Sequence, residues 1–87
     1  MEAVFYFSGM HYVYILQCAN GDYYKGCTAD LKDRFRRHTE GQVPATANNL
    51  PVLLAFYCAF PDKYKAFAFE KYLKSGSGIA FLNKRLV

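Results

Sequence analysis

The chain has 87 residues, a formal net charge of +4 and a hydrophobic fraction of 53%. This length fits one domain, and the apolar content, which includes eight Tyr and eight Phe, excludes an intrinsically disordered chain. The basic excess favours a polyanionic partner only weakly, because net charge governs association rather than fold.

The three cysteines are odd in number and form no CxxC pair, which argues against a disulfide framework or a zinc knuckle. The N-terminus shows no basic stretch followed by an apolar stretch, as a signal peptide would. The longest apolar run, residues 52–60, is too short to span a bilayer as a helix. We therefore expect a cytoplasmic protein with reduced, mostly buried thiols.

The first residues of the chain are expected to contribute little to the domain. Residues 1–9 form a peripheral segment in this prediction, although residues 4–7 have the composition of an additional strand. The domain itself is predicted to span residues 10–87, in which no internal repeat or low-complexity segment is visible.

A β-hairpin is predicted at the start of the domain. Residues 11–18 and 23–27 are rich in β-branched and aromatic side chains, and they flank a turn signal. A two-residue turn would place Tyr14 and Tyr24 on opposite faces, because side chains alternate along a strand. A three-residue loop, residues 19–21 with the glycine in the left-handed region, would place both tyrosines on one face.

A helix is predicted for residues 31–38, with Thr28 or Asp30 as its N-cap and Gly41 as its end. Apolar residues four positions apart supply the buried stripe of this helix. Residues 42–51 are expected to form a loop, because Pro, Asn and Thr are frequent there.

The second half of the chain predicts one strand and two helices. The apolar run from Val52 is expected to form a buried, central strand, and Asp62 is expected to cap a helix. Residues 75–78 predict a break, and residues 79–86 predict a short third helix. The apolar faces of these helices contain Ala66, Phe69 and Leu73, then Phe81, Leu82 and Leu86. The order ββαβαα predicts an α+β fold in which a small, three-stranded, mainly antiparallel sheet is flanked by helices.

Two sites on the predicted helices could carry chemistry. Arg34 and His38 are four residues apart, and they combine a fork suited to phosphate with a group that titrates near neutral pH. The alternative for this pair is an ordinary solvated basic face. Glu70 is the single acidic residue among six basic residues between positions 63 and 87, near an apolar helix face. A carboxylate there has either a metal or an ion-pair partner such as Lys74.

The hairpin supplies a third set, Tyr12, Tyr14, Tyr23 and Tyr24. Packing alone explains tyrosines in strands, because aromatic residues favour the pleated surface. A phenol with a pKa near ~10 is a poor base unless a metal-bound hydroxide or a nearby cation draws off its proton. The tyrosines therefore gain chemical meaning only together with the helix residues.

Four segments occur in a specific order, namely Tyr12-Val13-Tyr14, Tyr24-Lys25-Gly26-Cys27-Thr28, Asp30-Leu31-x-x-Arg34-Phe35-x-x-His38 and Glu70-x-x-x-Lys74. This order resembles the GIY-YIG nuclease superfamily, and in particular its small, single-domain bacterial members. The resemblance runs from about Met10 to the C-terminus. It favours the three-residue hairpin loop, because the family directs both motif tyrosines into one site. Tyr12 and Lys25 depart from the Gly and Ile of the name motifs, and Phe69 stands where a basic residue is frequent.

The resemblance implies a Mg²⁺-dependent DNA endonuclease, in which Mn²⁺ can substitute, with structure-selective or weakly sequence-specific action in DNA repair or processing. It assigns catalytic positions to Tyr14, Tyr24, Arg34, His38 and Glu70, with Glu70 as the metal ligand. The positions expected to contact nucleic acid are Lys25, Thr28, Arg37, Thr46, Lys74 and Lys84, and Asn83 falls near a helper asparagine of some members. The products implied by the resemblance carry a 5′-phosphate and a 3′-hydroxyl.

The implied chemistry suits these residue types. Mg²⁺ keeps several waters and takes few protein carboxylates, so Glu70 alone is enough to seat it beside a phosphate. Arg34 would clamp the non-bridging oxygens, and Tyr14, helped by Tyr24 or His38, would orient or deprotonate the attacking water.

Two other interpretations of the function remain open. The first is a catalytically inactive nucleic-acid-binding module with the same fold, and the second is a protein-interaction domain. Because no second domain is visible in the sequence, a homodimer or a protein partner is expected to supply specificity to a nuclease of this size.

Overall fold

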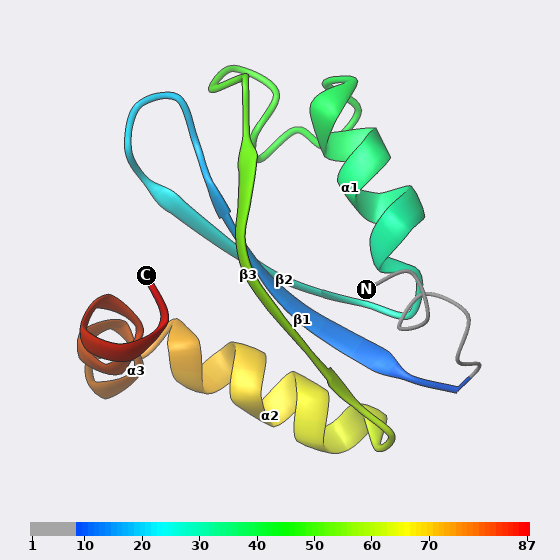
Figure 1. Ribbon diagram of the computed structural model, residues 1–87, viewed down its shortest axis with the longest axis vertical. Coiled ribbons are helices and arrows are strands. Elements are labelled where there is room, and N and C mark those ends of the chain that lie inside the picture. Colours follow the sequence, from blue (N-terminus) through cyan, green and yellow to red (C-terminus); the bar gives the residue numbers. More distant parts are fainter. Residues whose placement is uncertain (1–8) are drawn as a thin grey trace.

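The protein is described for residues 9–87 by a computed structural model (Figure 1). Its sheet has the strand order β2-β1-β3 and is antiparallel throughout, with β1 at His11–Gln17, β2 at Tyr23–Thr28 and β3 at Leu53–Phe60. The helices are α1 (Leu31–Thr39), α2 (Lys63–Leu73) and α3 (Gly76–Phe81), followed by a π-helical turn, η2 (Leu82–Leu86). The predicted α+β architecture is confirmed, and the predicted segment 1–9 lies outside the described residues except for Gly9.

Helices cover both faces of the sheet, so the domain has two apolar cores (Figure 1). The core on the α1 side consists of Tyr12, Tyr14, Leu16, Cys18, Leu31 and Val52. The core on the side of α2 and α3 consists of Val13, Ile15, Ala66, Leu73 and Leu82. Alternate residues of β1 enter opposite cores, as the period of a strand requires. No helix among residues 9–87 combines the length and the apolar character needed to cross a membrane.

The β1–β2 hairpin has the three-residue loop. The backbone N–H of Cys18 donates to the carbonyl oxygen of Asp22 at 2.8 Å, and Gly21 adopts a φ of +90°. Tyr14 pairs with Gly26, and Leu16 pairs with Tyr24. This register places Tyr14 and Tyr24 on the same face of the sheet, the face that α1 covers.

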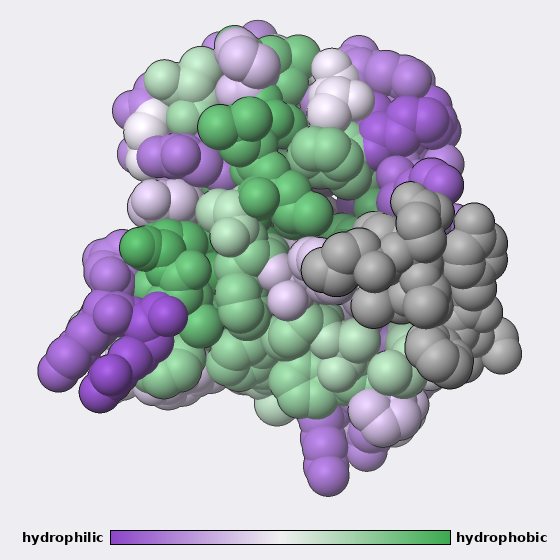
Figure 2. Space-filling model, viewed as in Figure 1, coloured by the Kyte–Doolittle hydropathy of each residue, from purple (hydrophilic) through white to green (hydrophobic). Residues whose placement is uncertain are grey.

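The position of β3 differs from the prediction. β1 is the central strand, and β3 lies at an edge of the sheet. An uninterrupted apolar run indicates that both faces of a strand are covered by helices, but it does not show whether other strands lie on both of its sides. Apolar side chains gather over β3 between α1 and α2 (Figure 2). Leu53, the first residue of β3, is 64% exposed.

The side-chain caps that start the helices agree largely with the sequence. The Asp30 carboxylate accepts from the N–H of Asp33 at 3.0 Å, and that of Asp62 accepts from the N–H of Tyr64 at 2.8 Å. These caps satisfy backbone donors that lack a partner in the first turn. Helix α1 ends before Gly41, whose φ is +75°.

The C-terminal helix begins earlier than predicted. The hydroxyl of Ser75 caps α3 by accepting from the N–H of Gly78 at 3.1 Å, so residues 76–78 are helical rather than a break. A Cβ atom at Gly78 would overlap the carbonyl group of Tyr72, which shows that this glycine allows α3 to pack against the end of α2. Leu82 is buried as expected, whereas Phe81 is 38% exposed and packs against Tyr72, with 6.1 Å between the ring centroids.

Candidate active site

The centre of the candidate site is the side chain of Tyr14, which lies flat across β2. A Cβ atom added to Gly26, the cross-strand partner of Tyr14, would overlap the phenol ring and its oxygen. Only glycine leaves room for the ring at this position, because every other residue carries a Cβ atom. The pair therefore explains physically why an aromatic residue and a glycine stand opposite each other in these two motifs.

A buried hydrogen-bond chain holds the Tyr14 hydroxyl. The oxygen lies 2.9 Å from Nε2 of His38, and Nδ1 of His38 lies 2.7 Å from the Thr46 hydroxyl. Helix α1 supplies the histidine, and the loop between α1 and β3 supplies the threonine. All three side chains are fully buried, so both ring nitrogens of His38 are satisfied inside the protein.

Tyr24 completes this aromatic group. Its ring centroid lies 5.1 Å from that of His38 and 6.3 Å from that of Tyr14. Unlike those two residues, Tyr24 is only half-buried. It is therefore the phenol of the pair that solvent and a substrate reach first.

Two opposite charges act on the Tyr14 hydroxyl. Burial, and then the charge of Tyr24 and more weakly that of Glu70, raise the pKa of Tyr14 to about 12, while Arg34 opposes the rise by charge and hydrogen bonding. Arg34 belongs to α1, and Glu70 belongs to α2 on the other face of the sheet. Both influence Tyr14 because its phenol extends over Gly26 toward the β2 edge, where the two faces meet.

The pKa of His38 is lowered from its usual 6.5, mainly by burial and also by the neighbouring Arg34 guanidinium. The imidazole is therefore neutral at pH 7, with one nitrogen that donates and one that accepts. With the hydrogen on Nδ1, His38 donates to Thr46 and can accept a proton from Tyr14.

Glu70 has the ion-pair partner that the sequence offered as one alternative. Its carboxylate lies 3.1 Å from Nζ of Lys74, with side-chain exposures of 22% and 55%. A partly exposed pair four residues apart on a helix contributes only about 0.3–0.5 kcal/mol, so it does not prevent a metal from binding. Among residues 9–87 no group of three or more His, Cys, Asp or Glu could hold a metal. A single carboxylate fits Mg²⁺, which is bound through one or two carboxylates plus water and phosphate oxygens.

The predicted nucleic-acid contacts do not form one group. Thr28 and Arg37 line a cleft beside Arg34, and Lys74 pairs with Glu70. The side chain of Lys25 lies on the face of β2 opposite to that of Tyr24, and α2 covers this face of the sheet. Lys84 and Asn83 are exposed on η2, which packs on that same side through Leu82.

Thr46 has a different place from the one expected. It was predicted to contact nucleic acid, but its exposure is 0% and its hydroxyl is bonded to His38. The loop folds this side chain inward, because the buried Nδ1 of His38 needs a hydrogen-bond partner. Thr46 therefore orients the histidine and has no surface to offer DNA.

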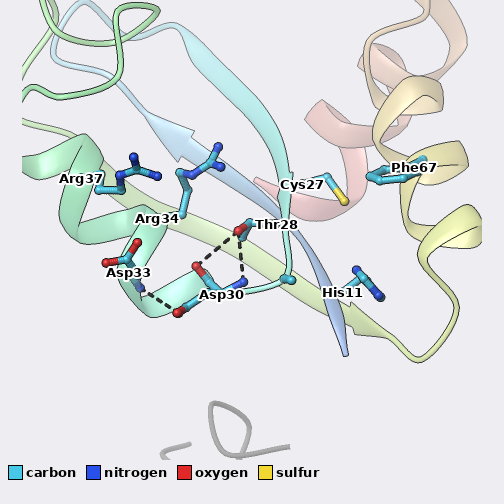
Figure 3. A pocket seen from close by; sticks show the side chains of 9 residues that line it. His11, Cys27, Thr28, Asp30, Asp33, Arg34, Arg37 and Phe67 are labelled. Carbon is cyan, nitrogen blue, oxygen red and sulfur yellow. Dashed lines mark hydrogen bonds between the residues drawn. The ribbon is translucent and has the colours of Figure 1, made fainter. Parts of the chain in front are cut away.

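The cleft beside Arg34 has a volume of about 460 Å³. Arg34 and Arg37 stand on its α1 side, and Cys27 and Phe67 stand across the end of β2, with His11 nearby (Figure 3). Sequence reasoning missed Phe67 and His11. The available signal for Phe67 was its position three residues before Glu70, which places both on neighbouring parts of one helix surface.

Comparison with known proteins agrees with this geometry. Residues 10–80 match the GIY-YIG family, described as the GIY-YIG catalytic domain. A UPF0213 protein of Lacticaseibacillus paracasei is 42% identical over 65 residues, which cover 74% of this chain and 73% of that protein. Another, from Cupriavidus pinatubonensis, is 35% identical over 77 residues, which cover 84% and 86% of the two chains.

A solved structure is similar as well. The solution NMR structure of the UPF0213 protein BH0048 from Bacillus halodurans superposes with a TM-score of 0.56 at 35% sequence identity. The superposition covers 86% of this chain and 83% of the other. The two proteins therefore share this fold.

Proposed function

Because the chain belongs to the family of GIY-YIG catalytic domains, we propose that it is a metal-dependent endonuclease that hydrolyses phosphodiester bonds in DNA. The observation that carries this proposal is the convergence of motif residues on the Tyr14 hydroxyl. His38 forms a hydrogen bond with this hydroxyl, and both Arg34 and Glu70 influence its pKa. A buried phenol set between a neutral histidine, a cation and a carboxylate is suited to proton transfer beside an anionic substrate.

Glu70 is the residue that we propose to hold Mg²⁺ or Mn²⁺, since it is a partly exposed carboxylate beside the Tyr14–Arg34 pair. The ion would neutralise charge on the phosphate and stabilise the leaving oxygen. Lys74 would then turn from Glu70 toward the DNA backbone, because an ion pair four residues apart on a helix is weak.

The chain's own residues perform the remaining tasks. Arg34 donates hydrogen bonds to the non-bridging oxygens of the phosphate, and Tyr24 positions the attacking water. As the water oxygen bonds to phosphorus, its proton passes to the Tyr14 oxygen while the Tyr14 proton passes to Nε2 of His38. The bond to the 3′ oxygen breaks, and this oxygen takes a proton from solvent. His38 then returns its proton through Tyr14 to solvent, which restores both side chains and balances the protons. The products carry a 5′-phosphate and a 3′-hydroxyl.

Cleavage of branched, single-stranded and duplex DNA, with Mg²⁺ or with EDTA, tests the proposal. Wild-type protein should cut at least one of these substrates with Mg²⁺ only. Glu70→Gln should lower the rate by at least about 100-fold, because it removes stabilisation of the transition-state charge. Glu40→Gln is the matched control, since Glu40 is an exposed carboxylate at the C-cap of α1 that pairs with Arg36 at 2.8 Å.

Two outcomes would contradict this mechanism. Cleavage that survives EDTA or Glu70→Gln would exclude the role given to the carboxylate. Binding to every substrate without cleavage of any would favour the alternative of a catalytically inactive DNA-binding module, in which Glu70 serves only its ion pair with Lys74.

A further inference from the structure

The cleft next to the proposed catalytic groups has two chemically different sides. Arg34 and Arg37 supply positive charge from α1, whereas Cys27 and Phe67 supply an apolar surface across the end of β2 (Figure 3). Its volume of about 460 Å³ lies within the range of about 300–1,000 Å³ typical of small-molecule sites. The cleft therefore has room for one nucleotide but not for a DNA duplex.

The cationic side remains available to a phosphate although two acidic residues also line it. The Asp30 carboxylate caps α1 by accepting from the N–H of Asp33 at 3.0 Å, and the Asp33 carboxylate lies 2.8 Å from Arg36. Within the described part of the chain, no ion pair involves Arg34 or Arg37. The acidic residues of the cleft therefore leave the positive charges of Arg34 and Arg37 available on this side.

The apolar side offers a ring at a defined distance from the proposed metal ligand. Phe67 is 49% exposed and lies three residues before Glu70 on α2. Residues three apart on a helix are surface neighbours, with about 5–6 Å between their Cβ atoms. Phe67 therefore lies on a part of the α2 surface that adjoins the proposed metal ligand.

We propose that this cleft is a subsite for one unstacked DNA base beside the cleaved bond, and that Phe67 is the ring on which the base stacks. The inference rests on the proposed nuclease function, because Arg34 and Glu70 define where the phosphate lies. A base inside a duplex is covered by neighbours on both faces, so only a base that has left the stack can lie on Phe67. The protein therefore prefers DNA with an unpaired nucleotide next to the cut.

Equilibrium binding to two duplexes tests the subsite, one fully paired and the other identical except for a single bulged nucleotide. Glu70→Gln protein is used so that the DNA stays intact, with and without Phe67→Ala. Loss of base–aromatic stacking should weaken binding to the bulged duplex by about 5- to 150-fold, and binding to the paired duplex by less than about twofold. Phe67→Tyr retains a ring and should restore the affinity.

Tyr64→Ala is the matched control, because Tyr64 is an aromatic residue of α2 that is 71% exposed and does not line the cleft. It should leave both affinities unchanged. The proposal is overturned if Phe67→Ala weakens both duplexes equally or weakens neither, or if Tyr64→Ala has the same effect.

The binding experiment separates this inference from the proposed enzyme activity. A wild-type protein that cuts no DNA, but whose Glu70→Gln form shows Phe67-dependent preference for the bulge, would refute the nuclease function and retain the base subsite. A wild-type protein that cuts DNA, but whose bulge preference is unchanged by Phe67→Ala, would refute the subsite alone.

Discussion

His38 shows at the scale of one residue how the fold prepares a group for proton transfer. Its imidazole is fully buried, and each ring nitrogen has one partner, the Tyr14 hydroxyl and the Thr46 hydroxyl. Burial disfavours the charged form, so the pKa is lowered from 6.5. The histidine therefore stays neutral in the folded state, over a range of pH in which a solvated histidine would become charged.

This lowered pKa predicts how stability depends on pH. At pH values between the lowered pKa of folded His38 and the pKa of about 6.5 in the unfolded chain, the unfolded chain binds more protons. The contribution of neutral His38 to the free energy of unfolding is therefore complete above about pH 6.5. It is lost as the pH falls toward the folded pKa. Urea unfolding at pH 7 and pH 5 should show a larger loss of stability on acidification in the wild type than in His38→Gln. An identical loss in both proteins would contradict the role assigned to burial of His38.

At the scale of secondary-structure elements, the site depends on the close crossing of β1 and β2. Position 26 must be a glycine, because any Cβ atom there would overlap the Tyr14 ring that lies across β2. The same ring then meets α1 through His38 and lies near α2 through the charge of Glu70. One cross-strand contact thus determines whether residues from two strands and two helices meet.

We predict that Gly26→Ala displaces the Tyr14 ring and lowers the free energy of unfolding by about 1–3 kcal/mol, the usual cost of overpacking. It should also reduce DNA cleavage strongly, because the Tyr14–His38 hydrogen bond would lengthen. Gly76→Ala is the matched control, since a Cβ atom there meets nothing within 4 Å. Equal unfolding midpoints for the two variants would show that β2 can shift to accommodate a methyl group.

Local signals predicted the elements well where the deciding contacts are local. The loop glycine at Gly21 and the caps Asp30 and Asp62 act within a few residues, and the structure confirms them. Gly78 was interpreted as a helix breaker, because propensity alone cannot show that α2 packs against it. The edge position of β3 was missed for a related reason, since a side-chain pattern records what covers a face and not which strand lies beside it.

The candidate site shows the same division. The spacing of Arg34 and His38 predicted that they share one face of a helix, because residues four positions apart are neighbours on a helix surface. It could not predict that Thr46 bonds to His38, since the path of a loop depends on tertiary contacts. The sequence does not predict an exposed ring at Phe67, because an aromatic residue on a helix is usually part of a core, whereas this side chain is 49% exposed.

At the scale of the whole molecule, the positive charges of α1 are not equivalent. Arg36 lies 2.8 Å from both Asp33 and Glu40, and it holds the pKa of the Asp33 carboxyl below its usual value. Arg34 and Arg37 face the cleft instead. The net charge of +4 therefore does not describe how charge is distributed on α1. The positive potential is stronger beside the cleft than around Arg36, whose charge is balanced by two carboxylates.

This difference predicts distinct salt dependences of DNA binding for two neighbouring arginines. If Arg37 neutralises one phosphate, Arg37→Ala should weaken binding and reduce the slope of log affinity against log salt by about 0.9 for duplex DNA. Arg36→Ala should leave the slope unchanged, because Arg36 does not line the cleft and pairs with Asp33 and Glu40 instead. Binding titrations at several KCl concentrations measure both slopes. Equal changes for the two variants would mean that α1 attracts DNA through its summed charge rather than through the face that carries the cleft.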